Sequence, residues 1–77
     1  MFAKLKALRA RQAQKAVNLD TAYLALTTVG RVPMREAAEV VRLAGIDGRM
    51  TEGEAVVAAF RMMRIPPSLR HRVVRRP

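Results

Sequence analysis

The chain has 77 residues, which allow one domain with a thin margin of stability, because so short a chain buries little more than half of its unfolded surface. Lys and Arg number 15 against 6 Asp and Glu, a net charge of +9 that favours polyanionic partners but indicates no fold. Cysteine is absent, which excludes a disulfide scaffold, a thiolate zinc site and a cysteine nucleophile. The uncharged stretch at residues 21–30 is about half of the roughly 20 residues that a membrane span needs, so we expect no integral helix.

Residues 2–17 are nearly all good helix formers and predict a first helix. A second helix, capped by Asn18 or Asp20, is expected to run to about Thr28 and to stop at Gly30. Neither Asn18 nor Asp20 forbids helix, so one continuous rod is the alternative. The basic side chains of this region have no acidic neighbour before Asp20, and they are Lys4, Lys6, Arg9, Arg11 and Lys15.

The middle of the chain predicts a third helix, which starts near Pro33 and runs to about Ala44. Gly45 and Gly48 follow its end, as is typical of helix C-termini. Arg35 and Arg42 lie at ion-pair spacing from Glu39 on its polar side. Its expected buried stripe consists of Met34, Ala37, Ala38, Val41 and Ala44.

A capping box gives the strongest local signal. Thr51 and Glu54 stand three residues apart before an apolar run, so hydroxyl and carboxylate can each accept the other residue's backbone N–H. The helix that follows should end at Ile65, before Pro66-Pro67, and Ser68 can cap a last short turn. Its expected buried face, from which Met62 is turned away, consists of Ala55, Val56, Ala59, Phe60 and Met63.

These elements predict an all-α fold, a small bundle of about four helices with basic N- and C-terminal arms, in a single domain over residues 1–77. The first 18 residues form a basic helical arm, residues 19–65 the helical body, and residues 66–77 a basic tail. Basic minus acidic residues gives 5 − 0 = +5 for residues 1–18, 4 − 6 = −2 for 19–54 and 6 − 0 = +6 for 55–77. The charge therefore resides at the ends.

Groups that carry enzymatic chemistry are nearly absent. The single histidine, His71, lies in the basic tail with Ser68 as its only neighbour of nucleophilic type, and two such groups without a third do not make a catalytic site. A twelve-residue calcium loop over residues 43–54 fails because its first and third positions, Leu43 and Gly45, offer no side-chain oxygen. We expect no enzyme, cofactor or metal.

The run from Asp47 to Glu52, Asp-Gly-Arg-Met-Thr-Glu, precedes an apolar helix and resembles the helix junction of TerB-like helical domains. The resemblance covers roughly residues 35–63 and implies a similar packing of helices. This chain lacks the upstream acidic residues that such domains commonly carry for metal, so the resemblance implies no metal site here.

A helix-turn-helix over residues 34–64 is the rival interpretation. Its turn would be longer than the usual three or four residues, and the recognition helix would begin with Glu52 and Glu54. Two carboxylates at the end that should enter the groove would be repelled by phosphates, so we do not favour this interpretation.

The first functional hypothesis is attachment to a nucleic acid backbone or a nucleoprotein assembly, with little sequence preference. If six to ten cations reach phosphates, affinity should fall about a thousandfold or more between roughly 50 and 200 mM salt. The expected phosphate-facing groups are the five basic residues of the first helix, Lys4, Lys6, Arg9, Arg11 and Lys15, together with Arg70, Arg72, Arg75 and Arg76 of the tail.

The alternative is a protein-interaction module, a small regulator, inhibitor or assembly subunit that docks on an acidic partner. Its expected interface is an apolar patch, and a solvent-facing Met62 beside an exposed Phe60 would favour it. Three further alternatives stay open: a homo-oligomer, weak association of the first helix with an anionic membrane surface, and a resemblance of that helix to an organelle-targeting peptide. The location we expect is cytoplasmic. The patch consists of Phe60, Met62, Met63 and Ile65.

Overall fold

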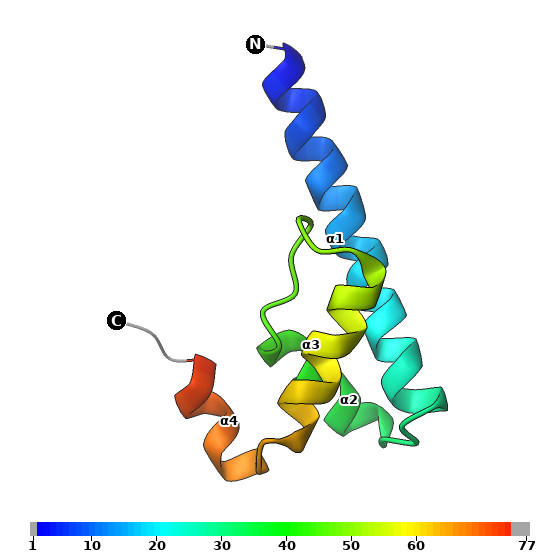
Figure 1. Ribbon diagram of the computed structural model, residues 1–77, viewed down its shortest axis with the longest axis vertical. Helices are drawn as coiled ribbons and strands as arrows, with labels where there is room; N and C mark the ends of the chain where they lie inside the picture. Colours follow the sequence, from blue (N-terminus) through cyan, green and yellow to red (C-terminus); the bar gives the residue numbers. More distant parts are fainter. Residues whose placement is uncertain (1, 75–77) are drawn as a thin grey trace.

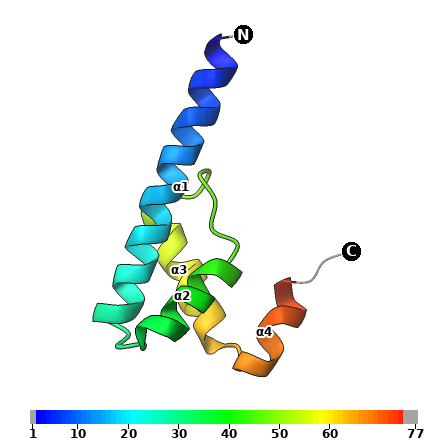
Figure 2. The same cartoon turned by 180° about the vertical axis from the view of Figure 1, so that it is seen from behind.

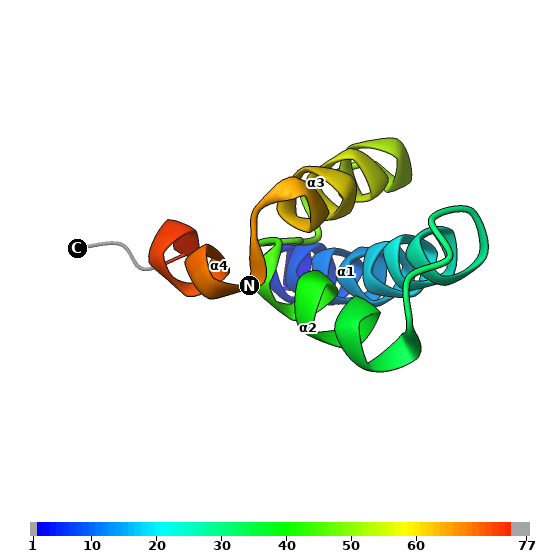
Figure 3. The ribbon, with the colours of Figure 1, turned by 90° about the horizontal axis from the view of Figure 1, so that it is seen from below.

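The computed structural model describes residues 2–74, and this part of the chain contains four helices and no strand. They are α1 (Phe2–Thr28), α2 (Met34–Leu43), α3 (Glu52–Arg64) and α4 (Pro67–Val74). The lower half of α1 packs against α2 and α3, which also contact each other, whereas α4 stands aside and contacts α2 (Figures 1 and 3). The predicted all-α bundle is confirmed.

α1 is one continuous helix of 27 residues, so the rod alternative is correct and no boundary falls at Asn18 or Asp20. The helix contains neither Gly nor Pro, and Ala, Leu, Lys, Arg and Gln dominate its first half. Beyond Thr28 the chain turns through Arg31, whose φ of 52° is left-handed. Gly30 is required there by space, because a Cβ would lie 2.8 Å from the Leu26 carbonyl oxygen and 3.1 Å from the Phe60 ring.

The core is small and rich in alanine. Four of its ten members are alanines, which let the helices approach closely, and Leu26 and Val40 are its largest fully buried members. The buried set comprises Ala22, Leu26, Val32, Ala37, Val40, Val41, Ile46, Ala55, Ala59 and Met62.

The buried stripe of α2 differs from the prediction by part of a turn. Met34 is 70% exposed and Ala38 is also exposed, while Val40 is fully buried. α2 contacts both α1 and α3, so its buried face centres on Ala37, Val40 and Val41. The helix ends as predicted, with Gly45 in the left-handed region at φ 71° directly after the last turn.

The capping box at the start of α3 is confirmed. The Thr51 hydroxyl accepts the Glu54 N–H at 3.1 Å, and the Glu54 carboxylate accepts the Thr51 N–H at 2.8 Å. α3 ends before Pro66-Pro67, also as predicted, but α4 begins at Pro67, so Ser68 lies inside that helix and does not cap it.

Candidate nucleic-acid interface

The first turns of α1 extend beyond the body, as Figures 1 and 2 show from opposite sides. All side chains of residues 3–13 are exposed, and none has a hydrogen bond or an ion pair with the body. At Arg11 the loop before α3 lies against the α1 backbone, with Gly48 as the residue in contact. We refer to residues 3–10, which lie beyond this contact, as the α1 arm.

The basic residues of α1 lie on both sides of the helix. Positions three or four apart share a helix face, and Asn18, Ala22 and Leu26 form the face that is fully buried against the body. Lys6 and Arg9 fall on the opposite side from that face. Counting back from Asn18 in steps of three or four reaches, on the same face, Lys15, Arg11, Leu8 and Lys4.

Asn18 connects α1 to the loop between α2 and α3. Its fully buried side-chain amide donates to the carbonyl oxygens of Asp47 at 2.8 Å and Met50 at 2.9 Å, and its Oδ1 accepts from Gln14 at 2.8 Å. Sequence reasoning considered Asn18 only as a helix cap. The sequence does contain a signal for its role in holding the loop: Asn18 is a polar residue at helical spacing from Ala22 and Leu26, on the face that packs on the core.

The loop over residues 44–51 and α1 border an open hollow of about 320 Å³. Arg11 and Lys15 line it from α1 and Asp47 and Arg49 from the loop, so three basic residues and one acidic residue border the hollow. The Asp47 carboxylate already accepts the backbone N–H of Arg49 at 2.8 Å. Arg49 was absent from the predicted site because it is 34 positions from Lys15 in sequence, and only the fold brings them together.

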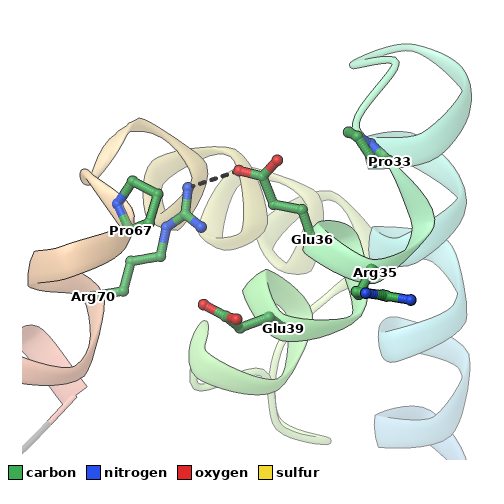
Figure 4. A pocket seen from close by; sticks show the side chains of 6 residues that line it. All are labelled: Pro33, Arg35, Glu36, Glu39, Pro67 and Arg70. Carbon is green, nitrogen blue, oxygen red and sulfur yellow. Dashed lines mark hydrogen bonds and ion pairs between the residues drawn. The ribbon is translucent and has the colours of Figure 1, made fainter.

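Arg70 is not a phosphate-facing group, contrary to the prediction. Only 2% of its surface is exposed, and it is the one Lys or Arg with a described side chain that is buried. Its Nε donates to the Ile65 carbonyl oxygen at 2.9 Å, and one Nη donates to the Met63 carbonyl oxygen at 3.2 Å. The same Nη donates to the Glu36 carboxylate at 3.3 Å (Figure 4). The pairs predicted around Glu39 do not form, and Arg70–Glu36 is the ion pair found within the described part of the chain.

The other predicted phosphate-facing residues of the basic tail are Arg72, Arg75 and Arg76. Arg72 is exposed on α4. Arg75 and Arg76 lie outside the described residues. Figure 1 places α4 at the side of the body, well away from the end of the α1 arm.

None of the four residues of the predicted apolar patch is fully exposed. Met62 is buried, with 6% of its surface exposed, which contradicts the expectation that it turns away from the core. Phe60, Met63 and Ile65 are half-buried and pack against the core. Because α3 is packed against both α1 and α2, its core stripe runs through Ala55, Ala59 and Met62. A solvent-facing Met62 beside an exposed Phe60 would have favoured the protein-interface hypothesis, and the structure does not show it.

A metal-binding cluster does not assemble over residues 2–74. His71 is exposed on α4, and no three His, Cys, Asp or Glu side chains gather closely enough to hold a metal ion in this range. None of the described helices is both long enough and apolar enough to cross a membrane.

Comparison of the chain with family models, with curated proteins and with solved structures found no match. The resemblance of residues 35–63 to TerB-like helical domains therefore stays a prediction from the sequence.

Proposed function

We propose that this protein attaches to the backbone of double-stranded nucleic acid, with α1 lying in a groove of the duplex. The observation that carries the proposal is the exposure of five basic side chains on both sides of a projecting helix that has no carboxylate before Asp20. They are Lys4, Lys6, Arg9, Arg11 and Lys15.

The dimensions of the basic part of α1 suit a groove. An α-helix with its side chains is about 10–12 Å wide and the major groove of B-form DNA is about 12 Å wide. From Lys4 to Lys15 the helix axis rises roughly 16 Å at about 1.5 Å per residue. Phosphates border a groove on two sides, so cations on both faces of the inserted helix find partners on both strands. Small side chains at Ala3, Ala7 and Ala10 allow the helix backbone to approach the duplex closely.

Geometry also supports α1 over α3 as the contacting helix. The start of α3 carries Glu52 and Glu54, and both carboxylates accept hydrogen bonds there, from Thr21 at 3.0 Å and from the backbone of Thr51. A helix-turn-helix would direct this acidic end at the duplex, where the phosphates repel it. The long connection over residues 44–51 is likewise too long for that motif.

A salt titration of binding to a mixed-sequence DNA duplex tests the proposal. With five phosphate contacts, log K should fall against log salt with a slope of about −4.5, or about 500-fold between roughly 50 and 200 mM salt. Duplex RNA of the same length should bind more weakly, because its major groove is too narrow for a helix. No binding at low salt would contradict the proposal and favour the alternative of an acidic protein partner.

A matched pair of variants separates the position of the charges from their number. Lys4→Gln/Lys6→Gln/Arg9→Gln removes three charges from the arm, and Arg35→Gln/Arg61→Gln/Arg64→Gln removes three exposed charges from the body. The arm variant should lower the magnitude of the salt slope by about 2.7 units, at about 0.9 per phosphate contact. The body variant should leave the slope nearly unchanged, and equal effects would show that only net charge matters.

A further inference from the structure

We propose that the hollow between α1 and the loop over residues 44–51 is a seat for one phosphate group, built by Arg11, Lys15 and Arg49. The inference rests on the proposed function and deepens it, because the seat would be the point at which the body, and not only the arm, engages the duplex. A phosphate group is the ligand chemistry, and it can belong to a nucleic acid backbone or to a free phosphate compound.

Charge and donor supply favour a phosphate there. The three cations that line the hollow outnumber its one carboxylate, for a formal net charge of 3 − 1 = +2, and Gln12 adds an amide donor. Arg11 and Lys15 are four residues apart on one helix face, with Cβ atoms about 6 Å apart. Arg49 lines the other wall. Planar guanidinium groups hold phosphate oxygens in pairs, while an ammonium adds a point charge.

The position of the wall that carries Arg49 is set by two independent contacts. Asn18 holds the loop by donating to the carbonyl oxygens on both sides of Arg49, those of Asp47 and Met50. Gly48 lies so close to α1 that a Cβ would overlap the Arg11 carbonyl oxygen. Because Asn18 is in line with Arg11 and Lys15, the residue that fixes the loop also fixes Arg49 opposite these two cations.

Two variants test the seat. Arg49→Gln removes its loop cation, and Gly48→Ala leaves every charge in place but forces the loop away from α1. Arg35→Gln is the matched control, an exposed arginine that lies outside the hollow. Circular dichroism and the thermal unfolding midpoint would show whether Gly48→Ala is folded, and if it is not, Arg49→Gln carries the test alone.

Two measurements are made on each protein. The first is the salt dependence of binding to the DNA duplex, whose slope should fall in magnitude by about 1 for Arg49→Gln and folded Gly48→Ala and stay unchanged for Arg35→Gln. The second is a titration with inorganic phosphate at constant ionic strength, followed by NMR. The side-chain N–H resonances of Arg11 and Arg49 should shift, and that of Arg35 should not.

The outcomes separate the seat from the proposed function. Equal behaviour of Arg49→Gln and Arg35→Gln in both measurements overturns the seat, and the arm variant then decides the proposed function by itself. Phosphate-induced shifts at Arg11 and Arg49 in a protein that binds no duplex would support the seat for a free phosphate compound and contradict the proposed function. Shifts spread equally over all exposed arginines would overturn the seat.

Discussion

A single buried amide joins the longest helix to the longest loop within the described residues. Asn18 is fully buried, and each of its side-chain polar atoms has a protein partner. Burying an amide is costly unless its hydrogen bonds are made. Here the amide donates to the carbonyl oxygens of Asp47 and Met50. These hydrogen bonds replace those with water and fix the position of the loop.

Replacement of Asn18 should therefore destabilise the fold. Asn18→Ala leaves two carbonyl groups without their donor, and we expect the free energy of unfolding to fall by about 2 kcal/mol. Asn18→Asp should lower the free energy of unfolding further near neutral pH, because a carboxylate has no N–H to donate and would place its oxygens against the two loop carbonyl oxygens. Urea denaturation measures both, with the exposed Gln12→Ala as the control, for which a change within about 0.5 kcal/mol is expected. Wild-type stability of Asn18→Asp would contradict this role.

At the scale of elements, α4 depends on one side chain. Leu69 and Val73 of this helix are 42% and 49% exposed, so it buries little apolar surface, and its contacts run to α2. Arg70 supplies the remaining attachment through Glu36 and the carbonyl oxygens of Met63 and Ile65. Arg70 and Glu36 line opposite sides of a groove between α2 and α4 (Figure 4).

We expect Arg70→Met to release α4 while the three-helix body stays folded. The substitution removes the donors for two backbone carbonyls and for Glu36, a loss of about 2–3 kcal/mol that falls mainly on the local docking of α4. Amide hydrogen exchange should become much faster in residues 67–74 and change little in α1. Arg72→Met, on the exposed side of the same helix, should leave exchange unaltered. A uniform increase across all helices would show instead that α4 is part of the cooperative core.

At the scale of the molecule, the basic residues of the two ends are not equivalent within the described part of the chain. The extents of the molecule are 43 × 33 × 18 Å, and part of its length is the α1 arm, which projects from the body (Figure 1). Arg70 is paired inside the protein, so it does not contribute to the basic surface that the composition of the tail suggests. The described structure therefore divides into a packed body and one projecting basic helix.

This division predicts that binding and stability can be separated by truncation. A chain that lacks residues 1–9 loses Lys4, Lys6 and Arg9, but no described side chain of this segment is buried. The free energy of unfolding should change by no more than about 0.5 kcal/mol. Affinity for the DNA duplex should fall, with the salt slope reduced by about 2.7 units for three lost contacts. A large loss of stability would mean that the arm is part of the fold.

The sequence by itself determined the local features of this protein. Helix-forming composition, the capping box at Thr51 and Glu54, Gly45 after α2 and Pro66-Pro67 after α3 specify where helices begin and end, because each acts through backbone groups within a few residues. The alanine-rich core and the charge of the first helix could also be predicted, since both follow from composition and helical periodicity.

Only the tertiary structure decided which of these side chains are available. Whether Met62 or Val40 is buried depends on which neighbouring helices contact α3 and α2, and periodicity allows several faces for each. In the sequence Arg70 is one of several tail arginines, and only the fold brings it beside Glu36, 34 residues earlier. Arg49 joins Arg11 and Lys15 because Asn18 draws the loop onto α1. Contacts between distant segments set burial and pairing, and they leave no periodic trace in the sequence.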